Sequence, residues 1–364
     1  MLLTLVSTLI VLGILIFVHE LGHFILAKKV GVKVLKFSLG FGPRLIGKKI
    51  GETEYQIAVF PLGGFVKPLG EDPNEEMSEE DRPRSFWAQP VWKRALIICA
   101  GPFFNFFLAV VIYSAVNVFA GVPSIQPIPP EINEVTSGSP AEQAGLKKGD
   151  FVISIDGQEI STWDDLREII HNSKGKELLL KVKRNDELLE FKVTPKQTSQ
   201  KTALGEEVRY PIIGVTPPPV KEVYNKVGFL SALGNGFVQT WDGIRFTVVV
   251  VVKLLQRAIP AKTIGGPIMI AKMAGEFAKR GLLWFVSFMA ILSINLGVIN
   301  LFPVPILDGG HLLFLGLEAA LGKPVSLRKM EIAQQVGLVL IILLMVFAFY
   351  NDILRLFSPE GFKF

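Results

Sequence analysis

Residues 2–27 read LLTLVSTLIVLGILIFVHELGHFILA, an apolar run whose only ionisable groups are His19, Glu20 and His23. The run is long enough to cross a bilayer as a helix, for which about 20 apolar residues suffice. On a helix, the H-E-x-x-H spacing puts both imidazoles on one face, where they can hold one metal ion. The glutamate between them is left free to act on a water molecule. The stretch therefore predicts a zinc hydrolase site inside a membrane helix.

Two alternatives compete with this interpretation. H-E-x-x-H also arises by chance in soluble helices, but three unpartnered polar groups buried in hydrocarbon would be costly, so the apolar surroundings favour a metal. A cleaved signal peptide would need basic residues before Leu2 and an A-x-A-like site after the run, and the sequence has neither. We therefore expect a retained transmembrane helix.

The composition narrows the class of protein. A mean hydropathy of +0.43 and 50% hydrophobic residues are typical of a membrane protein with a polar insert. The net charge is only +5, and no Lys/Arg block interleaves with aromatic residues, so we expect no nucleic-acid partner. The single cysteine, Cys99, excludes an intrachain disulfide and a thiolate zinc cluster.

Four segments are long and apolar enough to span a bilayer: 2–27, 95–120, 282–302 and 332–350. Loop charge gives their orientation. Twelve Lys/Arg lie within 28–94, and Lys323, Arg328 and Lys329 follow the third segment. Because positive loops stay in the cytoplasm, the amino terminus and the large insert are expected on the opposite side.

The loop at 28–94 contains a predicted β-hairpin. Tyr55 to Val59 alternates between polar and apolar residues, and a glycine-rich apolar stretch follows it. Such a hairpin can dip into the bilayer beside the site or remain a short soluble hairpin. In the first case an edge strand near Gly63, Gly64 and Phe65 would hold an unwound substrate by strand addition.

Proline-rich stretches near 123–130 and at 217–219 bracket an insert of different composition. Residues 139–150 lead into a predicted strand at 151–156, a helix at 163–171 and strands at 177–184 and 188–193. This order resembles a circularly permuted PDZ domain of the kind attached to bacterial proteases. PDZ folds capture peptides by strand addition, so Gly145 and Leu146 are predicted to contact a peptide carboxyl terminus. Alternatively, the glycines there only make turns.

The third apolar segment ends in N-L-F-P-V-P-I-L-D-G-G-H, from Asn300 to His311. A buried carboxylate beside helix-breaking prolines would complete a three-ligand zinc site with His19 and His23. The candidates for the third ligand are Asp308 and His311, one helical turn apart, and residue chemistry alone does not separate them.

Together, H-E-x-x-H, Gly101-Pro102-Phe103-Phe104-Asn105, the PDZ-like insert and N-x-x-P-x-P-x-L-D-G-G resemble the site-2 protease family. More narrowly, they resemble its bacterial RseP/RasP-type members, some of which carry two PDZ domains where this chain has room for one. The resemblance implies one zinc ion per chain, with Asp308 as third ligand and Asn300 contacting substrate. It also implies cleavage, in the bacterial inner membrane, of single-pass proteins such as anti-sigma factors or signal-peptide remnants.

The sequence thus predicts a polytopic α-helical membrane protein with about four transmembrane helices, a membrane-associated β-hairpin and an inserted α+β PDZ domain. The expected parts are a membrane core at 1–120, the extracytoplasmic PDZ domain at 121–205, interfacial amphipathic helices at 206–281 and the second half of the core at 282–364. The active site is expected towards the cytoplasmic side.

The predicted activity is that of an intramembrane zinc metalloendopeptidase in regulated intramembrane proteolysis, with Glu20 as general acid and base. Asn300 either binds substrate or bonds local carbonyls, and Asn105 either anchors substrate or ties helices together. A metal transporter and an inactive PDZ membrane scaffold are the alternative functions.

Overall fold

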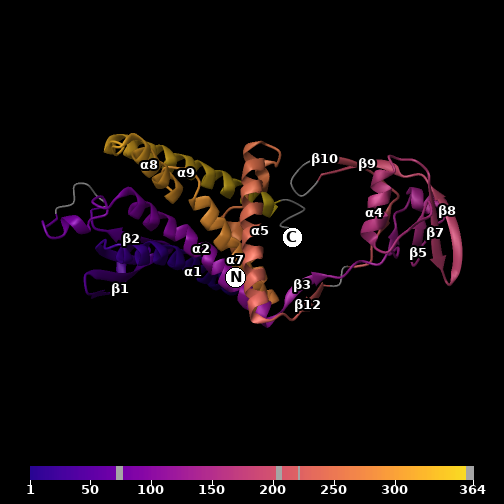
Figure 1. Ribbon diagram of the computed structural model, residues 1–364, viewed down its shortest axis with the longest axis horizontal. Helices are drawn as coiled ribbons and strands as arrows, with labels where there is room; N and C mark the ends of the chain where they lie inside the picture. The colour runs from indigo at the N-terminus through magenta and orange to yellow at the C-terminus, as the bar shows by residue number, and fades with distance from the viewer. Residues whose placement is uncertain (71–76, 202–206, 220–221, 358–364) are drawn as a thin grey trace. The chain divides into compact units, whose positions relative to one another are not determined.

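The computed structural model describes residues 1–70, 77–201, 207–219 and 222–357. The chain divides into two compact units (Figure 1). The first comprises Met1–Gly121, Lys226–Val252 and Ala261–Phe364, and the second comprises Val122–Asn225 with Lys253–Pro260. All residues predicted for the metal site belong to the first unit.

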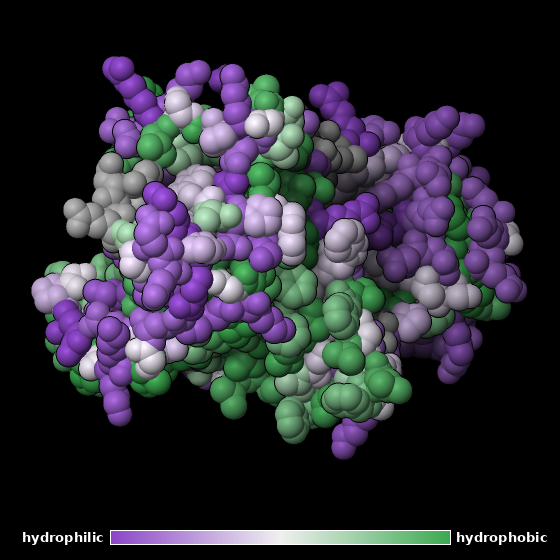
Figure 2. All heavy atoms as spheres, turned by 60° about the vertical axis from the view of Figure 1, so that its left-hand side comes forward, coloured by the Kyte–Doolittle hydropathy of each residue, from purple (hydrophilic) through white to green (hydrophobic). Residues whose placement is uncertain are grey.

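Four helices of the first unit are long and apolar enough to cross a membrane: α1 (Leu2–Lys29), α2 (Val91–Phe119), α7 (Leu282–Asn300) and α9 (Leu327–Phe357). They match the four spans predicted from the sequence. Between 11% and 44% of each apolar window is buried inside the structure, so many large apolar side chains face outward. Figure 2 shows such side chains gathered over a broad part of one face. This surface is typical of helices solvated by lipid.

The helices α1, α2 and α7 pack around small shared cores. Val11 and Leu15 of α1 lie against Met289 of α7, while Ala109 of α2 lies against Ala290 and Ile294 of α7. Small residues let the backbones approach, as is common in membrane bundles. At Gly22 of α1, a Cβ would lie only 2.3 Å from the carbonyl oxygen of Ala100 in α2.

Between α7 and α9, the chain breaks and restarts. Pro303 and Pro305 cannot continue α7 because each lacks an N–H and clashes with the preceding turn. The next helix, α8 (Asp308–Leu321), begins at Asp308 itself. A Cβ at Gly309 would lie 2.3 Å from the Leu301 and Phe302 carbonyl oxygens, and one at Gly310 would lie 2.3 Å from that of Val304. The two glycines therefore let α8 start directly against the proline linker.

The segment expected to form interfacial helices is more varied than predicted. Its first part forms strands β10 (Glu207–Ile212), β11 (Val215–Thr216) and β12 (Glu222–Asn225) that belong to the second unit, so the helical interpretation is wrong there. Short strands with Pro and Gly between them carry little periodicity, which explains the error.

The rest of that segment is helical, as α5 (Phe229–Leu255), the 3-10 turn η2 (Ala261–Thr263) and α6 (Pro267–Arg280). The helix α5 packs small residues against its neighbours, with Gly236 over Ser114 of α2 and Gly243 over Ile294 of α7. The amino terminus of α6 is capped from α9, because Asp352 accepts hydrogen bonds from the backbone N–H groups of Gly266 and Met269.

The predicted hairpin is confirmed and is longer than its alternating stretch, with β1 at Val34–Ile50 and β2 at Thr53–Pro68. Its register aligns Lys36 to Leu39 with both Glu54 to Ile57 and Gly64 to Lys67. Each strand therefore folds into two segments, and Gly64 to Lys67 lies at an edge of the resulting sheet. The hairpin turn is tied to the 3-10 turn η1 (Arg82–Arg84) and to the end of α1, because Glu52 pairs with Arg84 and with Lys28. These partners, chiefly the Arg84 hydrogen bond, hold the pKa of Glu52 below its ordinary value.

The second unit has the element order predicted for the insert. Its helices are α3 (Pro140–Ala144) and α4 (Trp163–Asn172), and its main sheet has the strand order β6-β5-β7-β8. The core includes Ile155, Leu166 and Leu180, each at most 1% exposed. The remaining strands pair as short ladders, β4 with β11, β9 with β10 and β3 with β12. Besides β10 to β12, the strands of this unit are β3 (Val122–Ile125), β4 (Glu134–Val135), β5 (Phe151–Ile155), β6 (Gln158–Glu159), β7 (Leu178–Arg184), β8 (Glu187–Val193) and β9 (Lys196–Lys201).

The insert begins and ends on one ladder. Val122 aligns with Asn225 and Ile125 with Glu222, so the entering and leaving chains run side by side. The unit continues past the end expected at residue 205, and the predicted boundary between 205 and 206 lies outside the described residues.

Candidate metal centre and its cleft

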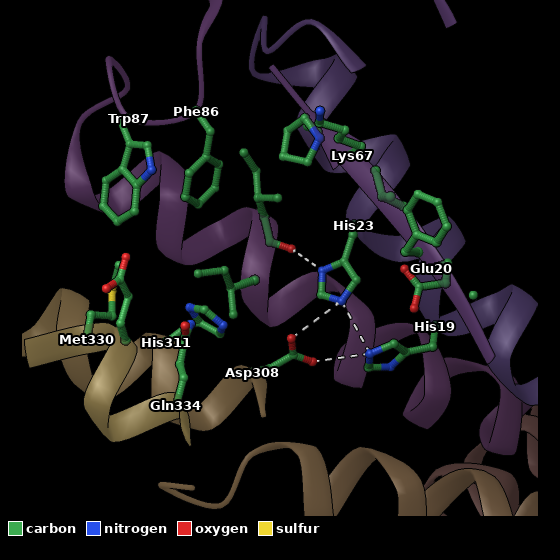
Figure 3. A pocket seen from close by; sticks show the side chains of 18 of the residues that line it. His19, Glu20, His23, Lys67, Phe86, Trp87, Asp308, His311, Met330 and Gln334 are labelled. Carbon is green, nitrogen blue, oxygen red and sulfur yellow. Dashed lines mark hydrogen bonds and ion pairs between the residues drawn. The ribbon is translucent and has the colours of Figure 1, made fainter. Parts of the chain in front are cut away.

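His19 and His23 of α1 meet Asp308, the first residue of α8, in the interior of the first unit (Figure 3). The Nε2 atoms of the two histidines lie 3.3 Å apart. Asp308 Oδ2 lies 3.2 Å from His19 Nε2, and Asp308 Oδ1 lies 3.6 Å from His23 Nε2. The side chain of His19 is 10% exposed, that of His23 is 15% exposed and that of Asp308 is 18% exposed. Residues 285 positions apart in the chain thus converge on one point.

This donor set fits a zinc ion. Tetrahedral zinc with bonds of about 2.0–2.1 Å keeps its ligand atoms about 3.3 Å apart, close to the separations seen here. Asp308 Oδ2 is buried and accepts no hydrogen bond from any described residue, so it is an acceptor in need of a cation. Its place at the start of α8, where the helix dipole favours negative charge, suits an ionised carboxylate. With three protein donors, a bound zinc ion would keep a position for water or substrate.

The other donor considered from sequence lies elsewhere in the same cleft. His311 is absent from the convergent group, which among the described residues consists of His19, His23 and Asp308. It lines the cleft on the far side of Asp308 from His19 (Figure 3).

The site opens into a cleft of about 710 Å³. The Glu20 carboxylate lies beside the two imidazoles and faces this space (Figure 3). The walls come from α1, β2, the chain before α2, α2 itself, α8 and the first turns of α9. The lining residues are His19, Glu20, His23, Ala27, Gly64, Phe65, Val66, Lys67, Pro68, Phe86, Trp87, Ile97, Ile98, Asp308, His311, Leu327, Met330, Glu331 and Gln334.

The edge of the hairpin sheet reaches the site at Gly64. A Cβ on Gly64 would lie 3.1 Å from Glu20 Cγ and 3.0 Å from Ile16 Cγ2. A side chain at this position would press on both of these groups, and glycine avoids that contact where β2 runs close to α1. Phe65 follows in the cleft wall and stacks on Phe41 of β1, with ring centroids 6.2 Å apart. A Cβ on Gly63 would overlap the same Phe41 ring.

The remaining predicted site residues divide into two groups. Asn300, the last residue of α7, places its Nδ2 atom 3.4 Å from His19 Nε2, next to the metal position. Asn105 of α2 contacts the other nitrogen of His19. Gly145 and Leu146 belong to the second unit, so the structure does not bring them into the metal cluster.

The sequence around Gly145 builds the fold of the insert. Gly145 ends α3 in the left-handed conformation with φ +89°, and Leu146 is a core residue at 3% exposure. Asp150 is fully buried, accepts the backbone N–H of Lys147 and forms a bidentate ion pair with Arg184. Helix termination thus accounts for Gly145, and an internal ion pair accounts for Asp150.

Comparison with known proteins agrees with this geometry. The sequence profile of peptidase family M50 matches residues 7–344. The chain belongs to peptidase family M50. The site-2 proteases are members of this family, so the resemblance predicted from the motifs is confirmed, and the protein is a zinc metalloprotease.

Family M50 relatives cover nearly the whole chain. The mll0638 protein of Mesorhizobium japonicum is 37% identical, over 96% of this chain and 98% of its own. The regulator of sigma-W protease RasP of Bacillus subtilis is 31% identical, over 97% of this chain and 99% of its own. The regulator of sigma-E protease RseP of Salmonella typhimurium is 32% identical, over 97% and 98%.

The RseP alignment extends over 451 positions although this chain has only 364 residues. That relative therefore carries many residues that have no counterpart in this chain. Among solved structures, the PDZ domain of the SdrC-like protein Lmo2051 from Listeria monocytogenes matches 26% of this chain and 92% of its own. The identity is 22% and the TM-score is 0.20.

One buried ion pair that supports the M50 site was not predicted from the sequence. Arg94 of α2, at 4% exposure, forms a bidentate ion pair with Glu318 of α8, with N–O distances of 3.0 and 2.5 Å. This pair fixes the helix that carries Asp308 against α2. A basic residue at the start of an apolar helix gives no sign of a partner 224 positions away, and only the fold identifies that partner.

Proposed function

We propose that this M50 protein hydrolyses a peptide bond within the transmembrane segment of a single-pass membrane protein. The observation that carries the proposal is the position of the donor set. Two histidine nitrogens and a carboxylate oxygen converge beside Glu20 in a cleft, and the two histidines and Glu20 lie on α1, a helix long enough to span a bilayer. The four spans and the RasP- and RseP-type relatives also support a multi-pass protein of the bacterial inner membrane.

In this proposal His19, His23 and Asp308 would hold a zinc ion, which when bound would supply Lewis-acid chemistry to the scissile carbonyl and to the attacking water. Glu20, which faces the same space, takes the proton from the attacking water and returns it to the leaving amine. Asn300 lies within 3.4 Å of His19 Nε2 and is placed to donate its amide N–H to the oxyanion or to the substrate backbone.

A substrate helix hides its peptide groups and must unwind before attack. The segment from Gly64 to Val66 lines the cleft and lies at an edge of the hairpin sheet. An edge strand can pair with an extended substrate. The cleft thus offers both the attacking group and a support for the unwound segment.

The sides of the membrane follow from loop charge. With the loops before α2 and between α8 and α9 in the cytoplasm, the metal site opens towards the cytoplasm and the inserted unit lies outside. The insert would then meet the extracytoplasmic part of a substrate and capture a peptide carboxyl terminus in a PDZ-type groove. Substrates of this class include anti-sigma factors shortened by another protease and signal-peptide remnants.

Substitution at the centre tests the mechanism. His19→Ala, His23→Ala and Asp308→Ala should each lower zinc content and abolish cleavage of a single-pass substrate by the detergent-solubilised protein. Glu20→Gln should keep zinc and reduce the cleavage rate by at least about 100-fold, since general acid–base groups contribute 10²- to 10⁴-fold. His311→Ala should keep its zinc, because His311 lies outside the donor group.

The same variants separate the competing functions. A metal transporter would still move zinc across liposomes with Glu20→Gln, and an inactive scaffold would show no cleavage to lose. Zinc retained in Asp308→Ala but lost from His311→Ala would overturn the ligand assignment.

A further inference from the structure

One face of α2 lies against both imidazoles of the candidate metal centre. Ile97, Gly101 and Asn105 follow one another at intervals of four residues, so they lie on the same side of the helix. A Cβ on Gly101 would lie 2.3 Å from His23 Nε2 and 2.8 Å from His19 Cε1. This close approach lets residues one turn to either side of Gly101 contact the far nitrogens of the two rings.

The contact at His23 shows what these neighbours do. His23 Nδ1 lies 2.8 Å from the carbonyl oxygen of Ile97, which can only accept a hydrogen bond. The proton of neutral His23 is therefore on Nδ1, and the Nε2 lone pair points at the metal position. Fixing the ring by a bond to its other nitrogen is the usual way in which proteins orient a metal-binding histidine.

At His19, Asn105 is the residue that can orient the imidazole through its Nδ1 atom. His19 presents Nε2 to the metal position, so its Nδ1 must carry the proton and needs an acceptor. Asn105 is fully buried, with its Nδ2 atom 3.1 Å from His19 Nδ1. Its Oδ1 atom is buried without a hydrogen-bond partner in the described part of the chain. A half-turn of the amide exchanges the two ends and places the unpaired acceptor against the His19 N–H.

We propose that Asn105 is a positioning residue for the metal, with its Oδ1 accepting the Nδ1 proton of His19 and so directing Nε2 to zinc. The inference rests on the metal site proposed above. It gives the same role to the side chain of Asn105 and the backbone carbonyl of Ile97, one for each histidine. The Asn105 backbone is itself held from α7, where Ser293 Oγ donates to its carbonyl oxygen at 2.7 Å.

Burial argues against a direct role of Asn105 in substrate binding. Its side chain is 0% exposed, and Asn105 is not among the residues that line the cleft. A substrate in the cleft would therefore touch Glu20 and the hairpin edge but not this amide. What remains is a contact with His19 that either orients the ring or merely joins α1 to α2.

Zinc affinity separates these two roles. Asn105→Leu keeps the volume but removes the acceptor, so zinc affinity, measured by competition with a chelator, should fall about 10- to 100-fold. Asn105→Asp restores an acceptor and should recover most of that loss. The absorption spectrum of the Co²⁺-substituted protein should be altered in Asn105→Leu and resemble wild type in Asn105→Asp. Ser114→Ala, which removes another buried polar group from α2, is the matched control and should change neither measurement.

Two results would overturn the inference. Wild-type zinc affinity in folded Asn105→Leu would show that the amide only joins helices. An equal loss in Asn105→Leu and Asn105→Asp, both folded, would show that the acceptor is not what matters. His19→Ala in the same series tests the metal site separately from the role of Asn105. If His19→Ala retained zinc, the proposed metal site would be wrong, independently of the results for Asn105.

Discussion

At the scale of single residues, the spacing of His19 and His23 predicted that their side chains lie close together, because residues four positions apart lie on the same face of a helix. The third donor was ambiguous from sequence, since Asp308 and His311 are also one turn apart. The structure brings the Asp308 oxygens to 3.2 and 3.6 Å from the imidazoles and leaves His311 outside the convergent group. The start of α8 at Asp308, made possible by Gly309 and Gly310, produces this difference.

The partner of His19 was not predictable from sequence. Asn105 is 86 positions away on another helix, and its meeting with His19 depends on how α2 is rotated against α1. The signal that was present is a lone amide in the middle of an apolar helix, which must find a buried partner. Sequence reasoning offered substrate binding and helix association for it, and neither names the partner.

Gly101 gives a prediction at this scale. Gly101→Ala should lower zinc affinity by at least about tenfold, the usual cost of disturbing ligand support, because its Cβ would overlap both imidazoles. Alanine favours helix over glycine, so a loss cannot come from a weaker α2. Chelator competition measures the effect, and Gly13→Ala, whose Cβ would meet nothing within 4 Å, is the control. Unchanged affinity in Gly101→Ala would contradict the packing described here.

At the scale of elements, the hairpin was recognised from the alternation at Tyr55 to Val59, but its length was not. Gly40, Gly42, Pro43 and Pro61 lie inside the strands, and such residues usually end or bend a strand. Here they accompany the register shifts by which each strand folds back on the sheet. The sheet edge at Gly64 therefore depends on tertiary structure, and the alternation of polar and apolar residues along the strand does not predict it.

Gly64→Ala tests the approach of this edge to the site. The added Cβ would push β2 away from Glu20 and Ile16, and small displacements at a reacting centre can cost about 100-fold in rate. We expect cleavage to fall by roughly 10- to 100-fold while zinc binding stays at wild-type level. Gly316→Ala on α8, with open space around its Cβ, should be silent in both assays. Normal cleavage by Gly64→Ala would argue against a substrate held along this strand.

At the scale of the whole molecule, hydropathy predicted the four spans, because lipid-facing helices need only length and apolar character. The insert was also recognised, since its turns and strands carry local signals. Its true extent was missed because strands β11 and β12 pair with β4 and β3, at the opposite end of the unit. Such long-range pairing leaves no trace in local composition.

The β3–β12 ladder makes removal of the insert a clean test of its role. Replacing 126–221 with a short Gly-Ser turn should leave a two-stranded hairpin where Ile125 meets Glu222. Since every proposed zinc ligand lies in the other unit, zinc content and cleavage of a short transmembrane peptide should persist, within about threefold by the usual scatter of distant changes. Cleavage of a substrate with an intact ectodomain should rise if the insert excludes bulky partners.

A chain carrying an unrelated soluble domain of similar size in place of 126–221 is the control for bulk. Restored exclusion in that chain would indicate a steric filter, whereas continued cleavage would indicate recognition by the native insert. If the shortened protein is folded and zinc-loaded yet cuts neither substrate, the insert takes part in catalysis and the division of labour is wrong.

The order of the metal donors along the chain has a consequence for biosynthesis. His19 and His23 leave the ribosome near the start of synthesis, whereas Asp308 follows only after the whole insert and α7. A nascent chain therefore holds two of the three donors for most of its elongation, without the carboxylate that completes the set. Domains fold as they emerge, from the amino terminus onward. With these three donors as the zinc ligands, we expect the protease to be inactive during synthesis and to become competent only once its last helices join the first.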